Sequence, residues 1–122
     1  MAGDSREEAP FAFNGLDRIF HERARLGIVT SLAGQPEGLA FAQLKRMCGL
    51  TDGNLNRHLA VLEEAGFISI HKDLTNRRPL TTCRVTPLGR ERFVEYLGEL
   101  EQALRQGARA ATGSVTLRPR TT

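Results

Sequence analysis

Apolar residues recur three or four positions apart in four stretches of the chain. The stretches are residues 15–33, 41–48, 51–65 and 87–106. This spacing is typical of helices that bury one face and expose the other. The pattern therefore predicts four helices. The first has a break near residues 21–23, where its apolar stripe shifts to another face.

Two short segments between the last two helices are rich in β-forming residues. Phe67, Ile68 and Ile70 predict one strand, and residues 81–86 predict the strand that returns. The polar sequence L-T-N-R-R-P-L at 74–80 predicts the turn between them. The expected fold is therefore mainly α with a small β-hairpin.

The second and third predicted helices are joined by about three residues that include Gly49, which is the spacing of a helix-turn-helix. Thr51 is a strong N-cap for the third helix, and small or polar residues follow it. In the major groove of DNA, asparagine pairs with adenine and arginine with guanine. Asn54, Asn56 and Arg57 therefore predict a helix that reads bases.

The predicted hairpin carries a basic cluster. Lys72, Arg77, Arg78 and Arg84 lie in it, with Asp73 as the opposing acid. Such charges suit DNA phosphates or the minor groove. A helix-turn-helix followed by a basic hairpin is the layout of a winged-helix DNA reader. The residues expected to contact DNA are Thr51, Asn54, Asn56, Arg57, His58, Lys72, Arg77 and Arg78. For His58, which lies beside Leu59, two interpretations remain open. It contacts a phosphate, or it packs against the protein.

Length and charge narrow the surface that DNA would contact. The chain has 122 residues and a net charge of +3. Three acids lie within residues 1–10, and four arginines lie within residues 105–122. Residues 11–104 are therefore close to neutral, so any contact with DNA must come from a local basic cluster. The length fits one domain. We expect a winged helix at 13–106, a disordered segment at 1–12 and a flexible basic tail at 107–122.

The last predicted helix carries more apolar surface than a small core needs. An isolated helix with this face would leave a large apolar patch in water. We therefore expect a homodimer in which helix 87–106 is the dimerisation helix and the first helix contributes. The residues expected at the dimer interface are Phe13, Leu16, Phe20, Phe93, Tyr96, Leu97, Leu100 and Leu104.

Several function classes lack support in the sequence. His21, His58 and His71 do not have the spacing of metal ligands, and we find no nucleophile–base pair or phosphate-binding loop. We expect no enzyme activity, no metal and no cofactor. No apolar run approaches the roughly 18 residues of a membrane span, and the N-terminus lacks a signal-peptide core. These features predict a cytoplasmic protein.

The two cysteines, Cys48 and Cys83, lie in separate elements and are expected as free thiols. Cys83 is the better candidate for an oxidation sensor, because a residue on a wing strand beside Arg84 can be partly exposed next to positive charge. Cys48 is typical of a small buried apolar residue. Since leucines of the chain itself are expected to fill the core, little space is expected for an inducer, whose identity the sequence does not indicate.

Three segments together resemble a known family. They are L-D-R-I-F-H-E-R-A-R-L-G-I-V-T-S-L, L-T-D-G-N-L-N-R-H-L-A-V-L-E-E-A-G-F-I and R-R-P-L-T-T-C-R-V-T-P-L-G-R. They look like the small stand-alone winged-helix transcriptional regulators of bacteria and archaea, similar to the MarR and ArsR groups. The resemblance implies a homodimeric, repressor-type binder of double-stranded DNA that acts on a palindromic operator. It also implies that Asn54, Asn56 and Arg57 face the major groove and that Arg77 and Arg78 lie at the wing tip.

The chain departs from both groups. Metal-sensing ArsR relatives carry a dense cysteine motif where this chain has L-K-R-M-C-G-L, and MarR relatives have longer helices around a ligand pocket. A winged helix can also bind a partner protein, so a protein-interaction module is the alternative function. The polar start of helix 51–65 favours DNA over an apolar protein partner.

Overall fold

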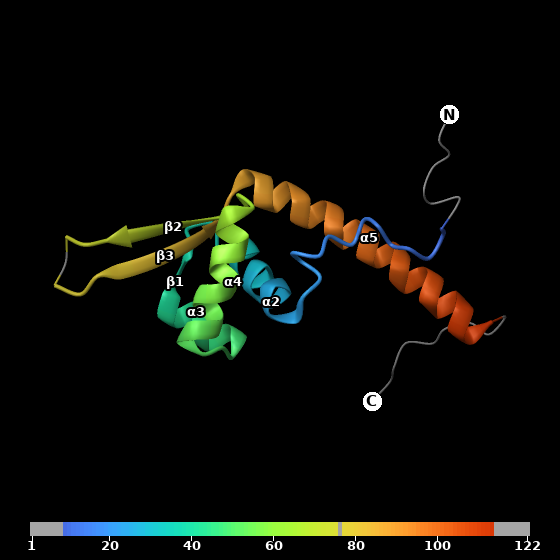
Figure 1. Ribbon diagram of the computed structural model, residues 1–122, viewed down its shortest axis with the longest axis horizontal. Coiled ribbons are helices and arrows are strands. Elements are labelled where there is room, and N and C mark those ends of the chain that lie inside the picture. Colours follow the sequence, from blue (N-terminus) through green and yellow to red (C-terminus); the bar gives the residue numbers. More distant parts are fainter. Residues whose placement is uncertain (1–8, 76, 114–122) are drawn as a thin grey trace.

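The structure, a computed structural model, describes residues 9–75 and 77–113. Within them the chain forms four helices and a three-stranded antiparallel sheet (Figure 1). In chain order the elements are α2 (Arg23–Ala33), β1 (Leu39–Ala40), α3 (Phe41–Cys48), α4 (Asp52–Glu64), β2 (Ile68–Asp73), β3 (Leu80–Val85) and α5 (Pro87–Thr112). No helix in this part of the chain is both long enough and apolar enough to cross a membrane.

The two predicted terminal segments extend beyond the described part of the chain. Residues 1–8 and 114–122 lie outside it, and so does Asn76 of the predicted turn. Residues 9–12, the described end of the first segment, form neither a helix nor a strand.

The sheet has the strand order β1-β3-β2, so β3 lies in the middle and β2 at an edge. β2 and β3 form the predicted hairpin, in which Ile70 pairs with Cys83 and Asp73 pairs with Leu80. The two-residue strand β1 is the third strand of the sheet, and in it Leu39 also pairs with Cys83. The hairpin, called the wing from here on, projects beyond the helices (Figure 1).

α3 and α4 form the predicted helix-turn-helix. Gly49 ends α3 with φ 64°, a left-handed conformation that glycine adopts without strain. Thr51 caps α4, since its Oγ1 accepts a hydrogen bond from the backbone N of Asn54 at 3.2 Å. The predicted leucine stripe of α4 is buried against the other helices. The sequence prediction of these two helices is confirmed.

The first helix begins later than predicted. Residues 15–22 form no helix, and α2 starts at Arg23. Asp17 Oδ1 accepts a hydrogen bond of 2.8 Å from a backbone N–H two residues on, and Glu22 is extended and caps α2 with its side chain. Such local side-chain bonds compete with helical hydrogen bonds. The predicted break near residues 21–23 is therefore confirmed, and the helical turns predicted before it are not formed.

An aromatic cluster joins the segment before α2 to α5. Phe20 is fully buried, and its ring centroid lies 4.8 Å from that of Phe67, 5.4 Å from Phe93 and 5.6 Å from Tyr96. These separations lie in the favourable range for aromatic pairs. The prediction that Phe20, Phe93 and Tyr96 lie at a dimer interface is therefore wrong, because all three are buried within their own chain.

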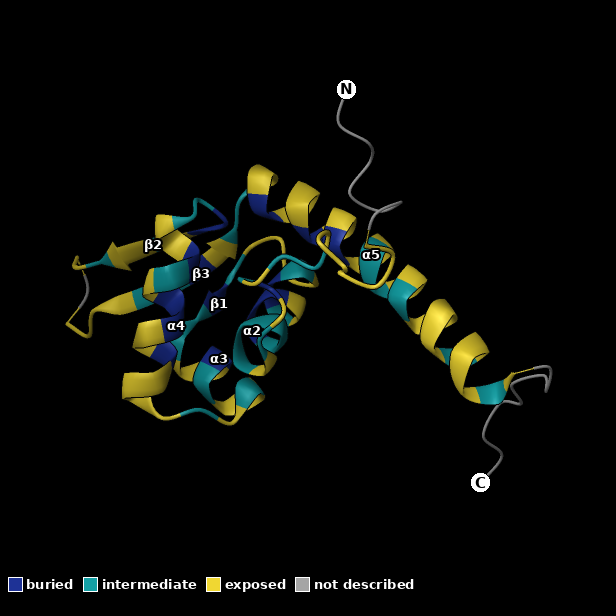
Figure 2. Cartoon of the chain, turned by 45° about the vertical axis from the view of Figure 1, so that its right-hand side comes forward, coloured by how far each residue is buried: buried dark blue, intermediate teal, exposed yellow. Residues whose placement is uncertain are grey.

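α5 begins at Pro87, as predicted, and Thr86 is its N-cap. Thr86 Oγ1 accepts a hydrogen bond from Gly89 N at 2.9 Å and donates one to Gly66 O at 2.6 Å. The helix continues through Thr112, so the start of the predicted flexible tail is helical instead. Its outer half has few large apolar residues, but alanine, glutamine and arginine are good helix formers. This half is largely exposed (Figure 2).

Gly89 provides a test of how α5 meets the body of the protein. A Cβ atom at Gly89 would lie 2.0 Å from the carbonyl oxygen of Phe67, which is backbone and cannot turn aside. Gly89→Ala should therefore lower the free energy of unfolding by about 2 kcal/mol or more. Denaturation by urea or heat measures the change.

Gly107→Ala in the same helix is the matched control. A Cβ atom at Gly107 meets nothing within 4 Å. Replacing glycine by alanine at an open helix position stabilises by roughly 0.5–1 kcal/mol, so the two variants should change stability in opposite directions. A stabilised Gly89→Ala protein would contradict the close contact between α5 and Phe67.

Candidate nucleic-acid interface

The first two turns of α4 expose a polar surface. Gly53, Asn54, Asn56 and Arg57 are exposed, while the leucines of the helix face the core. Arg57 Nη2 donates a hydrogen bond to Asn54 Oδ1 at 3.3 Å, so these two side chains lie together. An amide and a guanidinium at the exposed start of a helix are the groups that read base edges in DNA.

Asp52 places a negative charge beside this surface. Its Oδ1 lies 2.8 Å from Nζ of Lys45, which belongs to α3. An acid in the first turn also interacts favourably with the partial positive charge of the helix N-terminus. The ion pair connects α3 to α4, and it offsets the negative charge at the place where a phosphate would approach.

His58 does not lie on the polar surface of α4. Its side chain is buried, with Nδ1 3.2 Å from Nη1 of Arg25 and Nε2 3.3 Å from Oε2 of Glu22. Leu55 and Leu62 lie three and four positions away on the same helix face, and this spacing is the sequence signal for an inward position. His58 is therefore not among the DNA contacts that we propose. The sequence pattern does not single out Glu22 or Arg25.

The wing presents Lys72, Arg77 and Arg78 as exposed side chains. At the end of β2, Asp73 Oδ1 accepts hydrogen bonds from Thr75 Oγ1 at 2.6 Å and from Thr75 N at 3.0 Å. These bonds lower the pKa of Asp73 below its usual value. They also shape the start of the turn at the end of β2.

The predicted basic cluster is divided by the sheet. Side chains alternate between the two faces along a strand, so Arg84 lies on the face opposite to that of Cys83. Arg84 Nε donates a hydrogen bond to the carbonyl oxygen of Glu37 at 2.9 Å, which fastens the loop before β1. Arg84 therefore has a structural role, and the basic residues of the wing tip lie apart from it.

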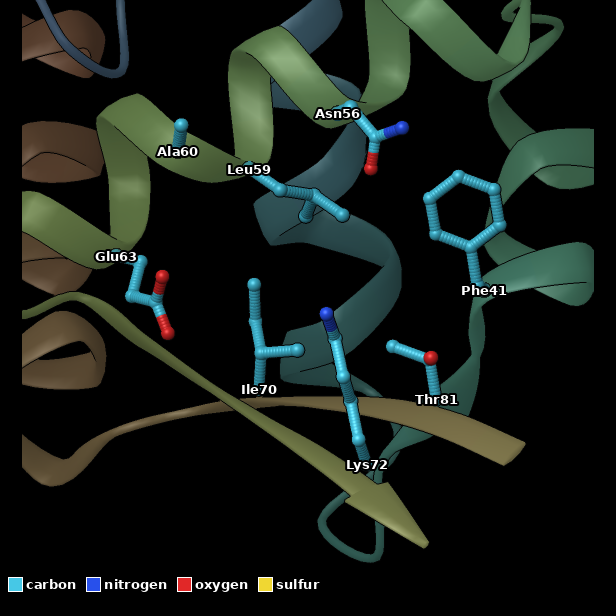
Figure 3. A pocket seen from close by; sticks show the side chains of 8 residues that line it. All are labelled: Phe41, Asn56, Leu59, Ala60, Glu63, Ile70, Lys72 and Thr81. Atoms are coloured by element: carbon cyan, nitrogen blue, oxygen red, sulfur yellow. The ribbon is translucent and has the colours of Figure 1, made fainter. Parts of the chain in front are cut away.

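A surface cleft of about 660 Å³ separates α4 from the wing (Figure 3). Phe41, Leu59 and Ile70 provide its apolar side chains. Asn56 of α4 and Lys72 of β2 also line it, and the Lys72 amine points from the strand toward α4 (Figure 3). The space lies between the two elements expected to contact DNA.

The two thiols, both free, have different surroundings. Cys83 is fully buried, and burial, with a smaller contribution from the carboxylate of Glu63, raises its pKa to about 11. The prediction of Cys83 as an exposed sensor is therefore wrong, because its place in β3 turns it inward. Cys48 is half-buried, with Sγ 3.8 Å from Ser31 Oγ. Across residues 9–75 and 77–113, no group of three or more His, Cys, Asp or Glu side chains could hold a metal ion.

Comparison with known proteins agrees with this geometry. A family model described as a winged helix DNA-binding domain matches residues 24–104. An uncharacterized protein of Methanocaldococcus jannaschii is 39% identical over 85 residues, which cover 70% of this chain and 91% of that protein. The chain therefore belongs to the winged helix DNA-binding domain family.

Solved structures place the fold among transcriptional regulators. A transcriptional regulator homologue from Pyrococcus horikoshii OT3 is 30% identical and superposes with a TM-score of 0.69, covering 74% of this chain and 88% of that one. A MarR family transcriptional regulator from Silicibacter pomeroyi shares the fold at 17% identity, with a TM-score of 0.54 and coverage of 92% and 74%. The predicted winged-helix fold and its resemblance to MarR regulators are confirmed.

The surroundings of the thiols predict different reactivity. Only the thiolate reacts readily with alkylating reagents, so Cys83 should stay unmodified in the native protein near neutral pH while Cys48 reacts. Mass spectrometry after treatment with N-ethylmaleimide should find one label without urea and two labels with it. Cys48→Ala should then take up no label in the native state. Equal labelling rates at both positions would contradict the buried position of Cys83.

Proposed function

We propose that the protein is a sequence-specific transcriptional regulator that binds a palindromic operator as a homodimer and represses transcription by occupying it. In this proposal α4 enters the major groove, and the wing contacts the adjacent minor groove or its phosphates. The residues assigned to DNA are Thr51, Asn54, Asn56, Arg57, Lys72, Arg77 and Arg78.

The observation that carries the proposal is the pairing of a polar α4 start with a basic wing across one cleft. In B-DNA a single phosphodiester strand separates the major groove from the adjacent minor groove. If α4 and the wing enter these two grooves, that strand runs between them, where Asn56 and Lys72 line the cleft. A protein partner would be expected to contact an apolar face, whereas Asn54 and Arg57 make the start of α4 polar.

The homodimer rests on apolar side chains that the chain itself does not cover. Leu97 and Leu104 of α5 are 43% and 65% exposed, and Phe13 before α2 is 37% exposed. Leu16 and Leu100 are half-buried against the core of their own chain. Of the residues predicted at the interface, Phe13, Leu97 and Leu104 therefore have exposed apolar surface that a second copy can cover.

Val94, which the sequence analysis does not single out, extends this surface. It is 63% exposed and lies three positions before Leu97 on α5. α5 extends away from the other helices (Figure 2), so a second copy can reach this face without meeting the wing. A two-fold axis near α5 would present two α4 helices to two half-sites of one DNA duplex.

Selection of bound sequences from a random DNA pool tests the proposed function most directly. We expect enrichment of an inverted repeat whose half-sites lie about one helical turn, or 10 base pairs, apart. A pool that shows no enriched sequence after repeated rounds would contradict sequence-specific recognition.

Two arginine substitutions should separate base reading from phosphate contact. Arg57→Ala should weaken binding to the selected sequence by roughly 1–3 kcal/mol and relax the preference at one position in each half-site. Arg78→Ala should weaken binding to many sequences alike and reduce the salt dependence of log K by about one unit. Fluorescence anisotropy titrations at several salt concentrations measure both effects.

Arg92→Ala is the control for loss of a positive charge, because Arg92 lies on α5, where it pairs with Glu95 at 3.7 Å. It should leave the affinity close to that of the wild type. If neither Arg57→Ala nor Arg78→Ala changed the affinity, the assignment of α4 and the wing to DNA would be wrong.

A charge introduced into the apolar face of α5 should dissociate the homodimer. Leu104→Asp should give a monomer in analytical ultracentrifugation and weaken binding to the inverted repeat, since a buried carboxylate without a partner is costly. Leu88→Asp is the control, because Leu88 is also an exposed leucine of α5 but lies on nearly the opposite face of the helix from Leu104. A wild-type protein that is monomeric at micromolar concentration would contradict the proposed dimer.

A further inference from the structure

Two consecutive residues before α2 reach two different helices. His21 Nδ1 lies 2.7 Å from the hydroxyl oxygen of Tyr96, on α5. Glu22 Oε2 lies 3.3 Å from His58 Nε2, on α4. The segment that carries both residues runs between α5 and the helices of the body (Figure 1). A chain of polar contacts therefore runs from the proposed dimerisation helix to the helix proposed to read DNA.

The contacts around His58 assign its protons. The guanidinium of Arg25 can only donate, so His58 Nδ1 accepts the hydrogen bond of 3.2 Å from Arg25 Nη1. The imidazole N–H is then on Nε2 and faces the carboxylate of Glu22. Both ring nitrogens have partners, and among the residues described, no buried side-chain polar atom lacks one.

Glu22 and Arg25 are themselves held in place. The Glu22 carboxylate accepts a hydrogen bond from the backbone N of Ala24, and Arg25 Nε donates to the carbonyl oxygen of Ile19 at 2.7 Å. Burial alone would raise the pKa of Glu22, but the hydrogen bond from Ala24 and the nearby His58 and Arg25 together lower it. Glu22 is therefore a charged, fixed group in this contact.

His58 is buried, whereas the reading residues Asn54 and Arg57 on the same rigid helix are exposed. Arg57 is adjacent to His58 in sequence, and Asn54 is four positions before it. A rotation of α4 that breaks the contact between His58 and Glu22 must also turn Asn54 and Arg57 away from their present direction. The buried contact therefore determines the direction of the exposed residues.

We propose that His21 and Glu22 link α5 to α4, so that the position of α5 in the dimer sets the orientation of the DNA-reading face. His58, Glu22, His21 and Tyr96 are then positioning residues that act on DNA recognition without contacting DNA. This inference rests on the proposed function, because orientation of α4 matters through its contacts with bases. A signal that changes how two α5 helices meet would reach the DNA-reading face by this route.

A double-mutant cycle tests the link. Tyr96→Phe keeps the ring in the aromatic cluster and removes the hydroxyl that meets His21. His58→Phe keeps a ring in the core and removes both nitrogen contacts. We expect each variant to weaken binding to the selected DNA about fivefold or more. The double variant should lose no more DNA-binding affinity than the single variant that binds DNA more weakly. The reason is that one broken contact already uncouples the two helices.

Two controls separate the link from a general loss of stability. Ser31→Ala removes a hydroxyl that bonds within α2, to Gly27 O at 2.8 Å, and should leave the affinity unchanged. His58→Gln keeps polar atoms near Glu22 and Arg25 and should restore much of the affinity that His58→Phe loses. All affinities are measured well below the melting temperature of the least stable variant. Unchanged affinity in the single variants, or losses that multiply in the double variant, would overturn the link.

A measurement on the free protein distinguishes failure of the link from failure of the proposed function. Amide hydrogen exchange in Tyr96→Phe should accelerate at the start of α4, although the substitution lies on α5. Uniform acceleration across the chain, or none in α4, would overturn the link whether or not the protein binds DNA. Accelerated exchange in α4 together with a wild type that selects no DNA would contradict the proposed function and leave the structural link supported.

Discussion

The buried ring of Phe20 is the contact on which the arrangement of the other elements depends. It lies among Phe67 at the base of the wing and Phe93 and Tyr96 of α5, so one side chain joins three parts of the chain. Phe20 belongs to a segment without helix or strand. Its position therefore comes from aromatic packing, and that packing in turn places the neighbouring His21 and Glu22 between α5 and α4.

Local signals predicted the elements of the fold. Thr51 as an N-cap, Gly49 as a helix end and Pro87 at the start of α5 each act through the backbone of their own segment, and each has the expected role. The turns before α2 were harder to predict. Their apolar spacing fits a helix as well as packed turns, and side-chain hydrogen bonds of Asp17 and Glu22 favour the turns.

The direction of a side chain depends on packing between segments, which spacing alone resolves incompletely. His58 and Cys83 both turn inward, although polar or basic neighbours in the sequence suggest an exposed surface. The aromatic residues of α5 illustrate the same limit, because an apolar stripe does not distinguish a core within one chain from an interface between two. Phe93 and Tyr96 belong to the core, while Leu97 and Leu104 on the same helix remain exposed.

The arginines serve two separate purposes that the net charge does not reveal. Arg84 and Arg25 donate to the carbonyl oxygens of Glu37 and Ile19, and so fasten irregular backbone segments. Arginine suits this use because its planar group offers several donors in fixed directions. The arginine charge available to a nucleic acid is therefore smaller than the sequence count suggests.

The place of β2 in the sheet has a consequence for the behaviour of the protein in concentrated solution. An edge strand offers unpaired backbone groups with which another chain can pair, and this is a common start of aggregation. β2 is flanked by β3 on one side and lies at the sheet edge, and its outer half carries His71, Lys72 and Asp73. Charged side chains on an edge discourage such pairing. The charges of the wing therefore also protect solubility, so a variant stripped of them would be expected to self-associate through β2.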